Sequence, residues 1–257
     1  MPTTDRSQNP FSAQRSQVFL RWLDDWLQTR DVLPLSILIE RAGGAGHVAL
    51  VLVDVIDGFC TDGPLASERV GNIVEPIARL VSAADYVGVG RLACLRDAHH
   101  PQAVEFDYYP PHSVHGSAES ELVAPLARLR EQRQHLVWSD FPKNSIAAWA
   151  AGEGGDQPTF RQWVAACRQG GVSTFVVAGD CTDLCTYHAA MGIRLLANER
   201  NEIGIRVVVP LDCVQTYDLP VAVAKRLDAL PHDGDLMHAV FAYQMALNGV
   251  EVVASLT

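Results

Sequence analysis

The chain has 257 residues, which is enough for one large domain or two small ones. Its formal net charge of −10 disfavours nucleic acid and anionic membrane surfaces as partners, because both attract basic faces. We expect a cytoplasmic protein, because the chain shows no secretory signal and no membrane-spanning apolar run, and because its six scattered cysteines fit free thiols.

The first part of the chain predicts a helix that stands apart from the main domain. One apolar stripe follows the helical repeat: Phe19, Leu20, Leu23, Trp26 and Leu27. Such a stripe needs a covering surface, which we expect to be the main domain or a second copy of the chain in a homo-oligomer. We therefore divide the chain into a helical extension, residues 1–46, and one domain, residues 47–257.

From residue 48 onward, strand patterns alternate with helical patterns. Six apolar runs predict strands: 48–55, 86–95, 135–139, 174–179, 204–212 and 250–256. Helical periodicity occupies the intervening segments: 68–84, 117–132, 159–171, 184–199 and 235–248. This alternation predicts an α/β fold, with a doubly wound, parallel, six-stranded sheet that carries helices on both faces.

In such a sheet, functional groups gather beyond the carboxyl ends of the strands. Residues with useful chemistry follow each of the first four predicted strands: Asp54, then 96–100, then 140–143, then 179–185. The topology would bring these segments together, so their convergence carries more weight than any single motif.

Two cysteines after the fourth strand, Cys181 and Cys185, lie four positions apart. Cys185 stands near the start of a predicted helix, where backbone N–H groups lower a thiol pKa and can bind an oxyanion. Cys181 is better placed to offer its backbone N–H than its sulfur. The spacing is not C-x-x-C and disfavours a zinc clip, while two small buried side chains at a strand end remain the alternative.

Asp54 and Lys143 could complete a nucleophilic site with Cys185. Asp54 lies near the end of an apolar strand, where a carboxylate is costly to bury unless it is used or paired. Lys143 follows the third strand, and together the three supply a carboxylate, a cation and a thiol. Taken singly, Asp54 could be a turn residue and Lys143 a solvated charge.

A second cluster has the character of a metal site. Asp97 and His99 share one side of an extended segment, and His112 lies in a proline-rich loop. Carboxylate and imidazole ligands suit one divalent ion, with zinc favoured and iron or manganese as alternatives. Glu105 could add a fourth ligand or hold a metal-bound water. A polar loop with incidental histidines is the alternative, and two further histidines are assigned to solvent: His100 and His115.

Five separated motifs, in this order, resemble the signatures of the isochorismatase-like cysteine hydrolases: VDVIDGF, RDAH, YPPHSVHG, the lysine of FPKNS, and VAGDCTDLC. The resemblance runs from about residue 48 to the C-terminus. It implies a triad with Cys185 as nucleophile, Asp54 as base and Lys143 as supporting cation. It also implies a cis peptide bond between Asp180 and Cys181, with the N–H groups of Cys181 and Cys185 directed at an oxyanion.

The branch of the family that the chain resembles most is the nicotinamidases. This implies hydrolysis of nicotinamide, or a related heteroaromatic amide, to the acid and ammonia through a thioester, as in NAD salvage. A metal held by Asp97, His99 and His112, with Glu105 as a further ligand in some members, would bind the ring nitrogen. Aromatic side chains would sandwich the ring: Phe59, Tyr109 and Trp149.

Two other interpretations remain open. One is a metal-free cysteine amidohydrolase of the same family that acts on a carbamoyl compound or another small amide. The other is an inactive family member that serves as a binding subunit through its N-terminal helix, although the intact triad argues against it. Bound metal would distinguish the metal-dependent, nicotinamidase-like enzyme from the metal-free amidohydrolase. Any turnover of an amide would exclude the binding subunit.

Overall fold

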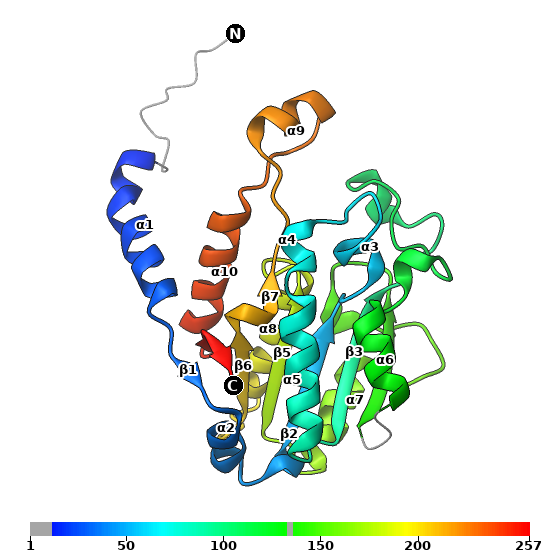
Figure 1. Ribbon diagram of the computed structural model, residues 1–257, viewed down its shortest axis with the longest axis vertical. Coiled ribbons are helices and arrows are strands. Elements are labelled where there is room, and N and C mark those ends of the chain that lie inside the picture. The colour runs from blue at the N-terminus through cyan, green and yellow to red at the C-terminus, as the bar shows by residue number, and fades with distance from the viewer. Residues whose placement is uncertain (1–11, 133–135) are drawn as a thin grey trace.

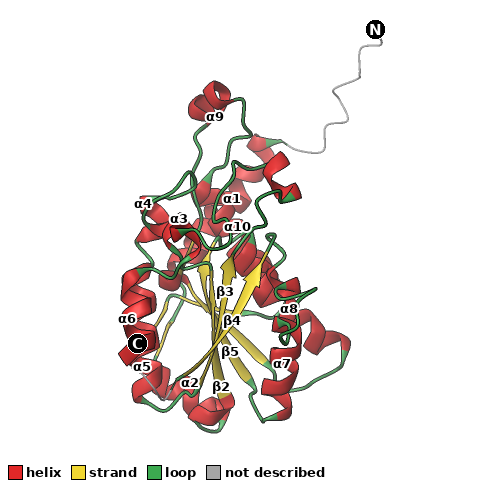
Figure 2. Ribbon diagram, turned by 90° about the vertical axis from the view of Figure 1, so that its right-hand side faces the viewer, coloured by secondary structure: helices red, strands yellow, loops and turns green. Residues whose placement is uncertain are grey.

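A parallel sheet with helices on both faces forms the centre of the computed structural model, which describes residues 12–132 and 136–257 (Figures 1 and 2). Its six main strands lie in the order β4–β3–β2–β5–β6–β8, and every neighbouring pair is parallel. Their bounds are β2 Val48–Val53, β3 Arg91–Asp97, β4 Val137–Lys143, β5 Thr174–Asp180, β6 Arg206–Pro210 and β8 Glu251–Val253. The predicted doubly wound, parallel sheet is confirmed.

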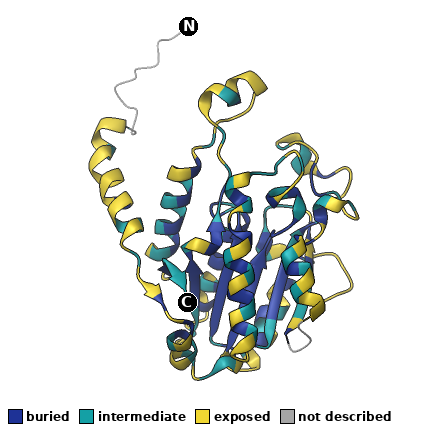
Figure 3. Ribbon diagram, viewed as in Figure 1, coloured by how far each residue is buried: buried dark blue, intermediate teal, exposed yellow. Residues whose placement is uncertain are grey.

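The central strand β2 is buried at every position, because helices cover both faces of the sheet (Figure 3). At its end, Val53 is paired with Leu95 of β3 on one side and with Gly179 of β5 on the other. A side chain at Gly179 would overlap the carbonyl oxygen of Val53, so only glycine permits this close approach. The residues that follow these positions therefore leave the sheet at one edge.

Two apolar layers lie on opposite faces of the sheet. Helices α5 (Val74–Tyr86) and α6 (Ala124–Gln132) cover one layer, which receives Leu50 and Leu52 of β2. Helices α7 (Phe160–Gln169), α8 (Cys185–Glu199) and α10 (Gly234–Leu247) cover the other, which receives Val51 and Val53. This alternation along one strand is the period of two expected of a strand with a core on each face.

Several element boundaries differ from the predicted ones. The helix predicted over 68–84 divides into α4 (Glu68–Gly71) and α5, and the strand predicted from 86 begins at 91 because Gly88, at φ +90°, lies in the turn that ends α5. The helix predicted over 117–132 begins at Ala124. Short helices were also missed: α2 Leu35–Ala42, α3 Asp57–Cys60 and α9 Val221–Leu227. His135 of the predicted third strand lies outside the described residues.

The N-terminal helix α1 (Ala13–Gln28) packs on α10, but the main domain covers its predicted stripe only in part, because Phe19 and Leu20 remain 42% and 37% exposed. Leu23 is buried, and the rings of Phe19 and Trp26 both contact Tyr243 of α10 edge-on. The following strand β1 (Val32–Leu33) pairs in parallel with β9 (Ser255–Leu256) at the C-terminus. We propose to keep 1–46 as an extension of the domain, of which 1–11 fall outside the described residues.

No helix in the described part of the chain is long and apolar enough to cross a bilayer.

Candidate active site

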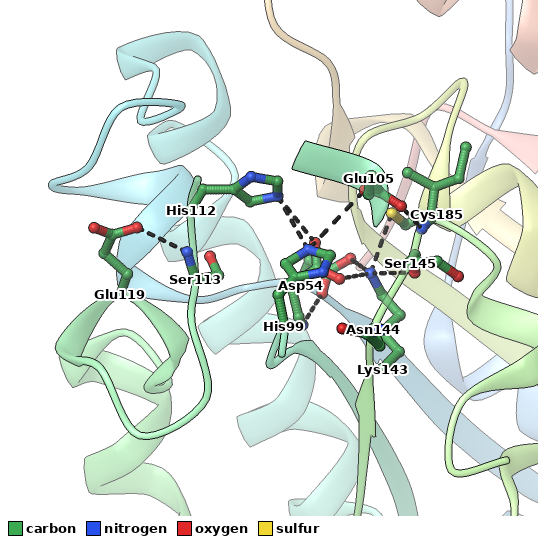
Figure 4. Close-up of polar contacts among 12 residues, drawn as sticks. Asp54, His99, Glu105, His112, Ser113, Glu119, Lys143, Asn144, Ser145 and Cys185 are labelled. Atoms are coloured by element: carbon green, nitrogen blue, oxygen red, sulfur yellow. Dashed lines mark hydrogen bonds and ion pairs between the residues drawn. The ribbon is translucent and has the colours of Figure 1, made fainter. Parts of the chain in front are cut away.

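Four buried side chains meet beyond the carboxyl ends of neighbouring strands (Figure 4). Asp54 follows β2, Asp97 ends β3, Lys143 ends β4, and Cys185 begins α8 after β5. None of the four is more than 5% exposed. The structure thus brings together the three residues predicted to act as a triad and places one predicted metal ligand beside them.

Lys143 is the cation at the centre of this cluster. Its Nζ lies 2.8 Å from Oδ2 of Asp54 and donates to Sγ of Cys185 at 3.3 Å. It also donates to Oδ1 of Asp97. Burial lowers the pKa of Lys143, but the carboxylates of Asp54 and Asp97 outweigh this effect and hold that pKa well above its usual value. The ammonium therefore stays charged at neutral pH.

Asp54 is held rigidly by the backbone around it. It adopts φ +55°, a conformation that aspartate tolerates better than most residues. Its N–H donates to the carbonyl of Leu95 at 2.9 Å, and its Oδ1 accepts the N–H of Asp97 at 2.7 Å. Burial, and then the charge of Asp97, raise the pKa of Asp54 to about 6, although Lys143 acts in the opposite direction. A carboxylate with a pKa near neutrality can accept a proton and return it.

Cys185 presents its sulfur to both the cation and the carboxylates. Its Sγ and the carboxylate oxygens of Asp54 and Asp97 all lie within 4.8 Å of one another. Burial raises the pKa of the Cys185 thiol well above its usual value; Lys143 lowers it, and the two carboxylates raise it further. A thiol in this state needs a base when it attacks, and Asp54 is in position to be that base.

The loop before Cys185 connects β5 to α8. The Asp180–Cys181 peptide bond is cis, as the family resemblance implied. The carbonyl of Cys181 accepts hydrogen bonds from the N–H groups of Leu184 at 3.0 Å and Thr186 at 3.2 Å. Cys185 is consequently fixed at the first turn of a 15-residue helix, where the helix dipole favours negative charge.

Asp97, His99 and His112 converge as a candidate metal centre. Nε2 of His99 lies 3.1 Å from Nε2 of His112 and 3.5 Å from Oδ2 of Asp97, and all three side chains are buried. Nδ1 of His112 lies 2.8 Å from the carbonyl of Pro110, which can only accept, so Nδ1 carries the proton and Nε2 offers a lone pair. Two imidazoles and a carboxylate directed at one point fit a divalent ion.

The charge of Asp97 suits both of its neighbours. Burial raises the pKa of Asp97, but Lys143 and the two histidines outweigh it and hold that pKa below its usual value. Its Oδ1 pairs with Lys143 and its Oδ2 faces the histidines, so one ionised carboxylate links the nucleophilic cluster to the metal centre.

Glu105 lies beside the metal centre rather than within it. Its Oε1 is 4.0 Å from Nε2 of His99, and its Oε2 accepts the N–H of Ile146 at 3.0 Å. This position suits a carboxylate that holds a metal-bound water better than a direct ligand. The other two histidines near the site, His100 and His115, are exposed, as expected.

The aromatic residues expected around the substrate divide into two groups. The ring of Phe59 lies 5.5 Å from that of His112, and the ring of Tyr109 lies 6.4 Å from it. Trp149 is elsewhere, because its ring packs against Phe160 and over Gly192 of α8, where an added Cβ would lie 2.5 Å from the indole. The structure therefore does not bring Trp149 to the metal centre.

Other residues near the site escaped the sequence analysis. Phe106 lies 5.7 Å from His112, ring to ring. His238 of α10 contacts Oγ1 of Thr182 at 2.9 Å, and His232 contacts Asp183 at 2.8 Å, so two histidines hold the loop before Cys185. No local pattern marks these two histidines, because both lie well beyond the end of the fifth predicted strand.

The part of the chain that forms the sheet and the site is similar to known proteins. Residues 48–229 match the protein-family description of the isochorismatase domain. Nicotinamidase 1 of Arabidopsis thaliana is 32% identical over 219 residues, which are 82% of this chain and 86% of that protein.

Solved structures agree with the fold. A nicotinamidase from Bacillus subtilis superimposes with a TM-score of 0.60 at 21% identity, over 80% of this chain and 99% of the other. A cysteine hydrolase from Pseudomonas syringae pv. phaseolicola 1448A gives 0.60 at 19% identity, over 81% and 89%. At these identities the structural likeness supports the fold alone.

Proposed function

Because this chain belongs to the isochorismatase family and is a hydrolase that acts on amides, we propose that it cleaves nicotinamide, or a related heteroaromatic amide, to the carboxylic acid and ammonia. The observation that supports this most is the contact of Lys143 with Asp54 and Cys185 directly beside the metal centre of Asp97, His99 and His112. One half of such a site can attack a carboxamide while the other binds the ring that bears it. The activity of the plant relative supports the choice of substrate.

In the proposed reaction, Sγ of Cys185 adds to the amide carbonyl carbon as its proton passes to Asp54. The tetrahedral intermediate collapses when Asp54 returns that proton to the leaving nitrogen, which departs as ammonia and leaves a thioester on Cys185. Water, deprotonated by Asp54, then adds to the thioester; the carboxylic acid departs and the thiol is restored. Each amide consumes one water, and Asp54 ends in the state in which it began.

Lys143 acts without exchanging its proton. Its ammonium, which donates to the sulfur at 3.3 Å, stabilises negative charge on Cys185 as the proton leaves. Its single positive charge also offsets part of the charge of the two carboxylates it contacts, which lowers the cost of burying them. The N–H groups of Cys181 and Cys185 are proposed to bind the oxyanion.

The metal centre is proposed to orient the substrate. Asp97, His99 and His112 would hold one divalent ion, with zinc favoured, and Glu105 would hold a water bound to it. When bound, the ion supplies an electrophilic position that a pyridine nitrogen can occupy. The aromatic rings beside His112 then enclose the substrate ring: Phe59, Phe106 and Tyr109.

A metal-free enzyme for a carbamoyl compound or another small amide is the second candidate. One observation favours it, because the ion pair of Asp97 with Lys143 gives Asp97 a role that needs no metal. The binding-subunit interpretation is set aside, because the chain is an amide hydrolase. We also propose a cytoplasmic location and a role in NAD salvage; all six cysteines are free, as expected in a reducing compartment.

Ammonia release tests the function directly. The purified protein is assayed with nicotinamide, benzamide and N-carbamoylglycine, with and without a chelator, beside Cys185→Ala. We expect nicotinamide to be the best substrate and chelation to weaken its binding. Equal turnover of benzamide and nicotinamide, unaffected by the chelator, would favour the metal-free enzyme, and no turnover of any amide would contradict both.

A further inference from the structure

Ser113 connects the two histidines of the candidate metal centre. It follows His112 directly in the chain, and its carbonyl accepts the N–H of His99 at 3.0 Å. The pairing continues in the other direction, because the carbonyl of His99 accepts the N–H of His115 at 2.9 Å. The backbone conformation of Ser113 therefore governs how His112 stands relative to His99.

Ser113 holds this place in an uncommon conformation. Its φ is +42°, in the left-handed region that residues with a side chain rarely adopt. Such a conformation persists only where the surrounding structure enforces it, and it is concentrated at active sites and ligand sites. Because Ser113 is fully buried, water does not satisfy its backbone N–H, and a protein acceptor is needed.

Glu119 supplies that acceptor. Its Oε2 accepts the N–H of Ser113 at 2.8 Å, and Figure 4 shows Glu119 on the opposite side of Ser113 from the other metal ligand, His99. A hydrogen bond to an ionised carboxylate is shorter and stronger than one between neutral groups. The bond is made to the backbone next to His112, so the effect of Glu119 on the metal centre passes through that backbone.

Two glycines leave space for the side chain of Glu119. This residue belongs to the short 3₁₀ helix η4 (Ala118–Ser120), which lies against α3. An added Cβ at Gly58 of α3 would lie 3.0 Å from Cβ of Glu119 and 2.7 Å from Oγ of Ser113. At Gly63, which has φ +148°, an added Cβ would lie 3.3 Å from Cδ of Glu119. Larger residues at both positions would crowd the carboxylate, so the local backbone is shaped around it.

We propose that Glu119 is a positioning residue for the metal centre. Its carboxylate holds Ser113 in the left-handed conformation and thereby places the ring of His112. The result is the approach of that ring to His99, with 3.1 Å between their Nε2 atoms. The inference rests on the proposed function, since it takes the two rings as ligands of one divalent ion.

Zinc titration of the full chain, freed of metal with a chelator, tests this role. Glu119→Ala leaves the N–H of Ser113 buried without its acceptor and should weaken zinc binding about 10-fold, a typical loss when a group that orients metal ligands is removed. Glu119→Gln keeps an oxygen that accepts the N–H, so it should bind zinc nearly as tightly as the wild type. Glu119→Asp keeps the charge but falls short of Ser113, so it should resemble Glu119→Ala.

Glu121→Ala is the matched control. Its side chain lies two positions along the chain, is 65% exposed and faces Arg96 at 3.6 Å, so its removal should leave zinc affinity unchanged. Melting curves establish that each variant is folded before its titration. Unchanged zinc affinity in both Glu119→Ala and Glu119→Asp, or a loss in Glu119→Gln equal to that in Glu119→Ala, would overturn the inference.

The visible absorption of bound Co²⁺ shows whether the ligand geometry changes, because it depends on how the ligands are arranged. The spectrum of Glu119→Ala should differ from that of the wild type, and Glu119→Gln should restore it. Iodoacetamide labelling of Cys185, followed by peptide mass spectrometry, should keep the wild-type rate in every variant. A changed labelling rate in Glu119→Ala would show a general loosening of the site and overturn the specific role.

Zinc affinity and amide turnover separate the failure of this inference from that of the proposed function. If zinc affinity responds to Glu119→Ala but the wild type cleaves no amide, the inference stands and the proposed function falls. If the wild type cleaves nicotinamide and Glu119→Ala binds zinc as tightly, the inference falls and the proposed function stands. A wild-type chain that binds no zinc overturns the inference, and its amide turnover then tests the function by itself.

Discussion

Lys143 and Asp54 form a fully buried ion pair, in which Nζ lies 2.8 Å from Oδ2 and the two side chains are 1% and 0% exposed. The pair stands next to the sulfur of Cys185, so the proposed nucleophile lies beside a cation and a carboxylate at once. The same cation also contacts Asp97, which connects it to the metal centre. We therefore expect stability and activity to depend on the same few side chains.

Removal of Lys143 should destabilise the fold as well as abolish activity. Lys143→Ala leaves two buried carboxylates without their cation, which costs about 3–5 kcal/mol in the free energy of unfolding. Urea unfolding measures this loss, and Lys225→Ala on the exposed surface of α9 is the control. A variant that is as stable as the wild type would contradict the charge arrangement described here.

The rate should depend on the ionisation of Asp54. Because the pKa of Asp54 is raised to about 6, its carboxylate becomes protonated as the pH falls through about 6, and kcat/KM should then decrease about tenfold per pH unit. Asp54→Asn should reduce the rate about 10²–10⁴-fold and remove this dependence. Asp62→Asn, outside the cluster, should keep the wild-type profile. A wild-type profile that stays flat down to about pH 4, the ordinary carboxyl range, would exclude Asp54 as the base.

His238 should make the stability of the fold sensitive to acid. Burial, and then Arg69, lower its pKa from 6.5 to about 4, against the opposite effect of Asp183 and Asp235. Its folded pKa lies below its unfolded one, so the unfolded chain binds more protons between these values. The contribution is present above pH 6.5 and disappears toward pH 4, a difference of about 3 kcal/mol.

Urea unfolding of the wild type and His238→Gln across this pH range measures the effect. The variant should lose less stability on acidification than the wild type. His100→Gln, at an exposed histidine, is the control and should follow the wild type. Parallel curves for the wild type and His238→Gln would show that folding does not lower the pKa of His238.

The metal centre should select for a ring nitrogen. His112→Ala removes one of two imidazoles and should lower bound metal, measured by elemental analysis, and raise KM for nicotinamide through misplacement of the substrate. His115→Ala, three positions away and exposed, should keep both values. If the purified wild-type protein binds no divalent ion on titration, the metal-free amidohydrolase is the better interpretation.

The sheet and most of the site were predictable because both depend on local patterns. Apolar runs define the strands, and parallel topology alone then brings Asp54, Asp97, Lys143 and Cys185 to one edge. The family resemblance, not spacing, implied the role of each. Local patterns also explain why residues 68–84 were predicted as one helix, because the apolar periodicity continues across the break between α4 and α5.

What the sequence did not predict depends on contacts between distant segments. His232 meets Asp183 across 49 positions, and His238 meets Thr182 across 56, with no local pattern to indicate either contact. Trp149 was expected at the substrate, but a short helical turn directs its indole toward Gly192 of α8, where the missing side chain leaves room for it. Aromatic side chains look alike in sequence whether they enclose a ligand or fill a core.

The central claim is that Cys185 attacks an amide while Cys181 contributes only its backbone. The most direct measurement is mass spectrometry of acid-quenched protein during turnover of nicotinamide, performed on the wild type, Cys181→Ala and Cys185→Ala. We expect a nicotinoyl thioester on the peptide that contains Cys185 in the wild type and Cys181→Ala, and neither adduct nor turnover in Cys185→Ala. An adduct on Cys181, or turnover that survives in Cys185→Ala, would contradict it.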